Sequence, residues 1–141
     1  MRVAFFGTPE FAVPSLRALL EEGFEVTVVV TQPDRPQGRS RSTLIPPPVK
    51  VVALDEEIPV LQPARPVGPF LDEFKAFNVD IAAVVAYGHI LRPELLALPR
   101  LGMINVHASL LPALRGAAPI QWSILNGDET TGISIIQLEA G

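Results

Sequence analysis

The sequence predicts an α/β protein built on a doubly wound, mostly parallel β-sheet. Strand-like runs alternate with helix-like segments along the 141 residues, and the runs are almost continuously apolar, which is typical of strands buried on both faces. Hydrophobic residues make up 48% of the chain and charged residues only 18%, so the chain can build a core and is not of the disordered class. Its length is that of one domain.

The N-terminal part has the pattern of a βαβ unit. Arg2–Phe6 is a short apolar run that predicts a buried first strand. Phe11–Glu22 carries leucines at helical spacing, with Pro14 near its start and Gly23 directly after it, so a helix is predicted there. Glu25–Thr31 is rich in β-branched residues and predicts a second buried strand, which we expect to run parallel to the first.

The rest of the chain continues the alternation. Ile81–Ala86 consists entirely of aliphatic residues and predicts a buried strand. A last strand is predicted at Gly132–Leu138, and we expect it to pair poorly, because the sequence stops shortly after it. The remaining predicted elements are helices over Val49–Asp55, Phe70–Phe77, Pro93–Ala97 and Ala118–Leu125, and strands over Pro59–Leu61 and Met103–His107.

The segment Gln32–Pro48 differs in composition from the rest of the chain. It holds five of the 15 prolines and predicts a long loop with a restricted backbone. Loops of this length inside a compact domain are usually functional. Arginines on an extended loop suit contacts with phosphate groups, although a solvated loop has the same composition. The local charge over Thr31–Lys50 is +3, from the residues Asp34, Arg35, Arg39, Arg41 and Lys50.

Composition excludes several classes of function. The chain has no cysteine and only two histidines, which removes thiolate metal sites and histidine-rich centres, so no metal is expected. The glycine-rich loop of dinucleotide-binding proteins and the Walker phosphate loop are both absent from the sequence. The net charge of −4 argues against general nucleic-acid affinity but permits a local basic patch. No targeting segment or membrane span is visible, so we expect a soluble cytoplasmic protein.

The topology predicts where a functional site would lie. Ligands of doubly wound sheets bind at the carboxyl ends of the strands, where loops leave the sheet. Four segments follow predicted strands in this way, and we expect them to form the site together: Gly7–Glu10, Gln32–Pro48, Tyr87–Leu91 and Asn105–Gly116.

Asn105 and His107 form the sharpest constellation in these segments. Residues two apart on a strand point to the same side, so we expect both side chains to face the site. An amide donor beside an imidazole suits the stabilisation of an oxyanion during acyl transfer, and histidine can carry a proton near neutral pH. The alternative is a pair of polar residues that merely ends a strand. Ser109 lies close by, but the elbow motif of a serine nucleophile is absent from the sequence, and no orienting acid is adjacent to Ser109 and His107.

Four segments resemble methionyl-tRNA formyltransferases, and the resemblance covers essentially the whole chain. The Asn-x-His and Ser-Leu-Leu-Pro pattern marks the wider class of formyltetrahydrofolate-dependent formyltransferases. The Gly-Thr-Pro start and the Thr-Gln-Pro-Asp-Arg-Pro loop narrow the resemblance to the tRNA enzymes. The four segments are Phe6-Gly7-Thr8-Pro9-Glu10-Phe11-Ala12, Thr31–Arg39, Val85–Leu91 and Ile104–Gln121.

The resemblance implies transfer of a formyl group from 10-formyltetrahydrofolate to the amino group of methionyl initiator tRNA, on a Rossmann-like formyltransferase fold. It implies that Asn105 and His107 are two of three catalytic residues, which polarise the formyl oxygen and stabilise the tetrahedral intermediate. The residues implied to bind ligands are Ser109, Leu110, Leu111, Pro112, Tyr87, Gly88, His89, Ile90 and Leu91 for the folate, Thr8, Pro9 and Phe11 for the methionyl group, and Arg39 and Arg41 for the tRNA acceptor stem.

The resemblance also implies that residues 1–141 are an N-terminal formyltransferase domain, incomplete at its C-terminal end. Members of this family have a third catalytic residue, an aspartate shortly after the glycine that matches Gly141, and a basic C-terminal domain that binds tRNA. We therefore expect a fragment of a monomeric enzyme from a bacterial-type cytoplasm or an organelle. Two other interpretations stay open. One is a formyltransferase that acts on a small amine, such as glycinamide ribonucleotide or an amino-sugar nucleotide, and the other is a folate-binding protein that does not catalyse.

Overall fold

The computed structural model is built on a six-stranded sheet with the strand order β5-β2-β1-β6-β7-β8. The structure describes residues 1–37, 43–107 and 134–138. Five strands of the sheet are parallel and β8 is antiparallel to β7, which confirms the predicted doubly wound, mostly parallel sheet. The strands are β1 (Arg2–Gly7), β2 (Glu25–Val30), β5 (Val60–Leu61), β6 (Ile81–Val85), β7 (Met103–His107) and β8 (Ser134–Leu138).

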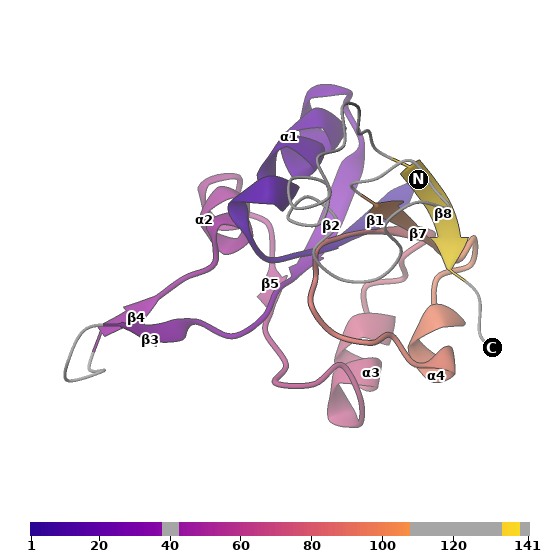
Figure 1. Ribbon diagram of the computed structural model, residues 1–141. Helices are drawn as coiled ribbons and strands as arrows, with labels where there is room; N and C mark the ends of the chain where they lie inside the picture. Colours follow the sequence, from indigo (N-terminus) through magenta and orange to yellow (C-terminus); the bar gives the residue numbers. More distant parts are fainter. Residues whose placement is uncertain (38–42, 108–133, 139–141) are drawn as a thin grey trace, which may run out of the picture.

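Helices cover both faces of the sheet (Figure 1). Two pack on one face, here called the α1–α2 face, and two on the other, the α3–α4 face. Each of the four α-helices in the described part of the chain has a proline in its first turn, where the missing backbone N–H leaves no intrahelical hydrogen bond unmade. The helices are α1 (Val13–Glu21), which a short 3₁₀ helix η1 (Glu10–Ala12) precedes, α2 (Pro48–Asp55), α3 (Pro69–Lys75) and α4 (Pro93–Leu96).

The core lies on both sides of β1. Strand alternation sends the Phe5 ring to the α1–α2 face, where it packs in one cluster with Leu16. The Phe6 ring lies on the α3–α4 face, with its centroid 5.4 Å from that of Phe74 and 5.3 Å from that of Tyr87, both edge-to-face. These aromatic contacts join β1, α3 and the segment after β6, and so they fix the strand ends relative to one another.

The predicted elements agree with the described ones to within a few residues, and the predicted helix Ala118–Leu125 lies outside the described part of the chain. The expectation of poor pairing at the last strand is wrong. Each of the five residues of β8 pairs with a residue of β7, from Ser134 opposite His107 to Leu138 opposite Met103. An antiparallel ladder on one edge is therefore sufficient to hold this strand.

A two-stranded antiparallel ribbon stands where the sequence predicted only a loop. It consists of β3 (Arg35–Gln37) and β4 (Thr43–Ile45), and Pro36 pairs with Leu44 at its centre. Among the described strands these two pair only with each other. The ribbon projects from the body of the molecule, as Figure 1 shows. Three-residue strands, one of them containing proline, leave no period-two pattern in a sequence, which explains why it was missed.

Candidate functional site

The carboxyl ends of β1, β6 and β7 lie side by side at one edge of the sheet. Gly7 pairs with Val85, and Val84 pairs with Asn105. A Cβ atom on Gly7 would lie 2.8 Å from the Val85 carbonyl oxygen and 3.0 Å from the Ala12 Cβ. Glycine therefore lets η1 pack closely against the strand ends, and the turn that follows brings Thr8 to the segment after β6.

A hydrogen-bond network holds three of the four predicted segments together. The Thr8 hydroxyl donates to the Tyr87 carbonyl oxygen at 2.9 Å, and the Gln32 side-chain amide donates to the same oxygen at 3.1 Å. The Gln32 backbone N–H in turn donates to Thr8 Oγ1 at 3.3 Å. The site expected from the topology is thus formed by segments far apart in the sequence.

The turn after β6 has an unusual backbone. Ala86 has a φ of 51° and Gly88 a φ of 97°. A Cβ atom on Gly88 would collide with the side-chain amide of Gln32, which occupies that space in order to reach the Tyr87 carbonyl. Strained residues such as Ala86 persist only where their surroundings hold them, and they are concentrated at functional sites.

Tyr87 contributes its backbone to this site and its side chain to the core. The side chain is 2% exposed, and its ring lies edge-to-face with Phe6 and with His89, whose centroid is 5.4 Å away. The phenol oxygen has no hydrogen-bond partner among the described residues. Burial raises the pKa of Tyr87 to about 12, so the phenol stays neutral. Ile90, two residues after Gly88, is 87% exposed.

A cavity of about 380 Å³ lies between the network and the base of the ribbon. Thr8 and Pro9, both predicted to bind substrate, line it, whereas Phe11 lies in η1, is 37% exposed and is not part of the lining. The walls are mainly apolar, and the other lining residues are Gln32, Pro33, Arg35, Ile45, Pro46, Pro47, Pro48, Ala86, Tyr87 and Gly88.

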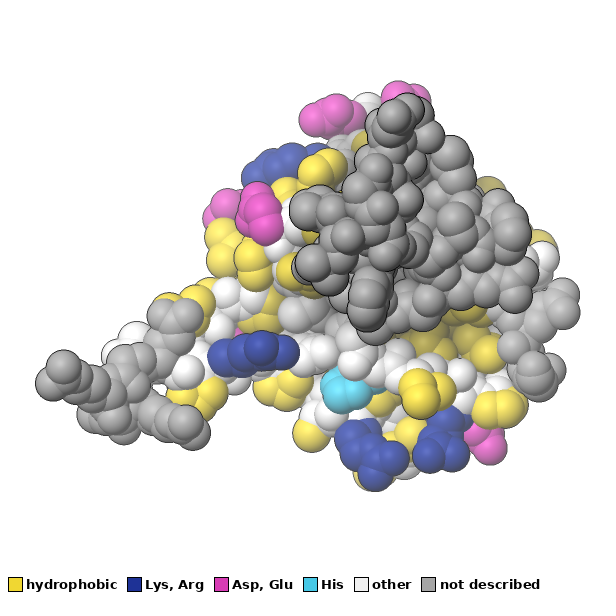
Figure 2. All heavy atoms as spheres, viewed as in Figure 1, with side chains coloured by type: hydrophobic (Ala, Val, Ile, Leu, Met, Phe, Trp, Pro, Cys, Tyr) yellow, Lys and Arg dark blue, Asp and Glu magenta, His cyan; other side chains and the backbone are white. Residues whose placement is uncertain are grey.

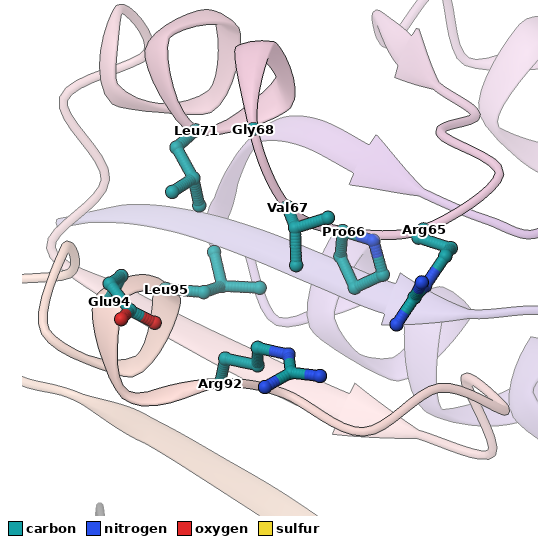
Figure 3. Close-up of a pocket in the computed structure, with 8 residues that line it drawn as sticks. All are labelled: Arg65, Pro66, Val67, Gly68, Leu71, Arg92, Glu94 and Leu95. Atoms are coloured by element: carbon teal, nitrogen blue, oxygen red, sulfur yellow. The ribbon is translucent and has the colours of Figure 1, made fainter.

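A second cavity, of about 340 Å³, was not predicted from the sequence. Figure 3 shows the guanidinium groups of Arg65 and Arg92 on the same side of this pocket, with the aliphatic side chains of Val67, Leu71 and Leu95 lining the space beside them. Arg92 directly follows the Tyr87–Leu91 segment. Both arginines precede a proline, which favours an extended backbone in a loop, but this local pattern does not indicate that the two loops meet.

Asn105 and this second cavity lie on the same face of the sheet. Asn105 is half-buried and follows Met103 by two residues, and Met103 is buried in the core of the α3–α4 face. Leu71 and Leu95, which line the pocket, pack in the same core. His107 ends β7, but its side chain lies outside the described part of the structure, as do all of Ser109, Leu110, Leu111 and Pro112.

The structure describes only part of the predicted basic patch. Arg35 is exposed and donates to Gln32 Oε1 at 3.2 Å, whereas Arg39 and Arg41 lie outside the described residues. Lys50 does not belong to the patch, because its Nζ donates to both carboxylate oxygens of Asp34, at 3.0 and 3.1 Å. On the face shown in Figure 2, the described Lys and Arg side chains do not form one continuous patch.

The described residues offer few sites for other functions. Within them, no group of three His, Cys, Asp or Glu side chains could hold a metal ion. Of the helices in this part of the chain, none has the length and apolar character needed to cross a membrane.

Comparisons with known proteins place these features in context. A family described as "Formyl transferase" matches residues 1–141. Curated methionyl-tRNA formyltransferases from Citrifermentans bemidjiense and Geobacter sulfurreducens are 54% and 52% identical over 100% of this chain. The chain spans 44% of the length of each of these two relatives.

Solved structures share the fold. A phosphoribosylglycinamide formyltransferase from Bacillus halodurans superposes with a TM-score of 0.76 at 21% identity, over 100% of this chain and 73% of its own. A glycinamide ribonucleotide transformylase from Geobacillus kaustophilus gives a TM-score of 0.75 at 24% identity, over 99% of this chain and 75% of its own. At such low identity these likenesses show the architecture alone.

Proposed function

Since this chain belongs to the formyl transferase family, we propose that it catalyses the transfer of a formyl group from 10-formyltetrahydrofolate to the amino group of methionyl initiator tRNA. The observation that carries the proposal is the identity of 51–54% with curated methionyl-tRNA formyltransferases along the whole chain. The two glycinamide ribonucleotide formyltransferases named above are only 21% and 24% identical to this chain, which favours the tRNA substrate over a small amine.

The chain is proposed to be the N-terminal catalytic part of a longer, monomeric protein. It spans less than half the length of its curated relatives. The aspartate expected as third catalytic residue and the tRNA-binding domain then belong to the remainder of that protein. The activity of the whole enzyme requires both parts, because the expected catalytic set is shared between them.

The formyl donor is proposed to bind on the α3–α4 face. Tetrahydrofolate ends in a glutamate whose carboxylates suit the guanidinium groups of Arg65 and Arg92, which line one pocket together with Glu94. The pocket lies on the same face as Asn105, and the Tyr87–Leu91 segment leads directly to Arg92. In this orientation the glutamate tail of the donor lies at the arginines, its middle part lies along Gly88, His89, Ile90 and Leu91, and its formyl group lies at β7. Ser109, Leu110, Leu111 and Pro112 complete the donor site in this proposal.

The methionyl end of the tRNA is proposed to enter the cavity between Thr8 and the base of the ribbon. Its apolar, proline-rich wall suits a thioether side chain. Pro9, which lines the cavity, directly precedes η1, and Phe11 lies within η1. The ribbon carries Arg39 and Arg41 between β3 and β4 in the sequence, so these arginines are proposed to contact the phosphates of the acceptor stem.

Asn105 and His107 are proposed to stabilise charge during the transfer. The methionyl amine attacks the formyl carbon, and negative charge develops on the formyl oxygen. The Asn105 amide donates a hydrogen bond to that oxygen. His107 adds a second hydrogen-bond donor to the same oxygen. The aspartate expected beyond this chain accepts the proton from the attacking amine, and a proton reaches the folate nitrogen as the carbon–nitrogen bond of the donor breaks.

An assay with two acceptors tests the proposal. The complete protein is supplied with the formyl donor and either methionyl initiator tRNA or glycinamide ribonucleotide, and the formylated product is measured. We expect kcat/KM to be much higher for the tRNA than for glycinamide ribonucleotide. We also expect Asn105→Ala to lower the kcat/KM for the tRNA strongly. A preference for the small amine would establish the small-amine formyltransferase instead. Donor binding by calorimetry without any formyl transfer would establish a non-catalytic folate-binding protein.

A further inference from the structure

The base of the β3–β4 ribbon contains a partly buried ion pair. Asp34 directly precedes β3, and Lys50 lies in the first turn of α2, shortly after β4. Lys50 Nζ donates to both Asp34 carboxylate oxygens, at 3.0 and 3.1 Å. The two side chains are only 20% and 22% exposed, so solvent screens this pair less than it would a surface pair. The contact therefore ties the two ends of the ribbon to each other.

Gln62 connects this ion pair to the sheet. It follows the edge strand β5, and its Nε2 donates to Asp34 Oδ1 at 2.7 Å and to the Gln32 carbonyl oxygen at 3.1 Å. A primary amide has two N–H groups, so both bonds form at once. The hydrogen bonds from Gln62 and from Lys50 hold the pKa of Asp34 below its usual range, which keeps the carboxylate charged at neutral pH.

Among the described side chains of the ribbon, Arg35 makes one further hydrogen bond, to Gln32 Oε1 at 3.2 Å. The two strands of the ribbon pair only with each other among the described strands, and the ribbon projects from the body (Figure 1). Leu44 and Ile45 of β4 are 60% and 40% exposed, so they bury little surface against the body. A small rotation at the base of a projecting ribbon moves its far end by a much larger distance. The contacts at the base therefore control the direction in which it points.

We propose that Asp34, Lys50 and Gln62 form a clamp that sets the direction of the ribbon, and that they are positioning residues for the RNA acceptor. The functional part of this inference rests on the proposed function, in which the ribbon contacts the acceptor stem. Lys50 then acts through Asp34 and not by contacting phosphate. Without the clamp the ribbon occupies several directions, and the apparent affinity for the acceptor falls in proportion to the fraction of molecules in the competent one.

Charge-changing variants of the complete protein separate a clamp from direct attraction of RNA. Asp34→Ala removes a negative charge, so direct electrostatics predicts a lower KM for tRNA, whereas the clamp predicts a higher one. Gln62→Leu changes no charge and is also expected to raise that KM. If a fifth of the molecules keep the competent direction, the increase is about fivefold. We expect the KM for the formyl donor, and kcat at saturating tRNA, to stay within about twofold of wild type.

Lysine variants provide the matched controls, because Lys50 and Lys75 are the two lysines of the chain. Lys50→Met and Lys75→Met change the net charge equally, but only the first removes the clamp. We expect Lys50→Met to raise the KM for tRNA about as much as Asp34→Ala does, and Lys75→Met to leave it near wild type. Lys50→Arg keeps a cationic donor and should restore most of the affinity.

A distance measurement tests the clamp independently of activity. Spin labels are attached to Leu44→Cys on β4 and Leu54→Cys on α2, both exposed positions, in a complete protein without other cysteines. We expect one narrow distance distribution in the protein with an intact clamp, and a broad one after Asp34→Ala or Gln62→Leu. An unchanged distribution, or a lower KM for tRNA in Asp34→Ala, would overturn the proposal. If the complete wild-type protein does not formylate methionyl-tRNA, the proposed function is wrong. The distance distributions then still test whether the clamp sets the direction of the ribbon.

Discussion

Replacement of Gly88 by alanine tests the network around the Tyr87 carbonyl. Gly88 has a φ of 97°, and a Cβ atom there would displace the Gln32 amide from its 3.1 Å hydrogen bond. An alanine at positive φ costs about 1–2 kcal/mol, of which about 0.4–1 kcal/mol is recovered because the unfolded chain is less free. The lost hydrogen bond adds about 1 kcal/mol. We therefore expect Gly88→Ala to lower the free energy of unfolding by about 2 kcal/mol.

Gly23 provides the matched control for backbone strain. Its φ is 83°, and a Cβ atom there would have no neighbour within 4 Å. Gly23→Ala should therefore cost only the strain, about 1 kcal/mol. Urea unfolding followed by circular dichroism measures both variants. Equal losses for the two glycines would refute the displacement of Gln32.

A double-mutant cycle sharpens the same test. Gln32→Ala removes the hydrogen bond without adding strain at Gly88, and we expect it to cost about 1 kcal/mol. In the Gly88→Ala background that bond is already absent, so the second substitution should cost close to nothing. The expected coupling energy is thus about 1 kcal/mol, and strictly additive losses would contradict the geometry.

Four further outcomes are expected. Asn105→Ala should lower the single-turnover rate constant of formyl transfer by roughly 10²–10³-fold, while the donor affinity measured by calorimetry changes little. Arg41→Ala should raise the KM for tRNA and flatten its salt dependence, and loss of donor binding instead would make the assignment of the ribbon wrong. Gly7→Ala should lower the urea midpoint by the equivalent of about 1–3 kcal/mol, because its Cβ would press on the Val85 carbonyl oxygen. The lowered pKa of Asp34 gives stability that is fully present at neutral pH and is lost as pH falls below about 4, so the stability difference between wild type and Asp34→Asn should shrink with acidification.

The fold could be predicted from the sequence because its strands are buried on both faces. Arg2–Phe6 and Ile81–Ala86 are nearly continuous apolar runs, a pattern that few other architectures require. The ribbon was missed because its strands are only three residues long. The Asp34–Lys50 contact at its base joins residues that are 16 apart in the sequence, and no local pattern encodes such a contact.

The sequence predicted which segments come together at the candidate site better than it predicted which of their side chains take part. The segments after β1, β2 and β6 do meet, because parallel strands end at one edge of the sheet. The part of Tyr87 that joins the network is its carbonyl oxygen, while its ring fills the core. Arg65 and Arg92 were missed because they belong to different loops and come together only when α3 and α4 pack on the same face.

The position of β1 at the centre of the sheet has a consequence for synthesis on the ribosome. β1 pairs with β2 on one side, but its other neighbour, β6, ends 55 residues later in the chain than β2 does. At about 5–20 residues per second, one edge of this apolar strand waits unpaired for about 3–11 seconds. During that interval the nascent chain exposes a strand edge that can pair with other chains, so a chaperone that binds apolar segments should bind β1 until β6 emerges.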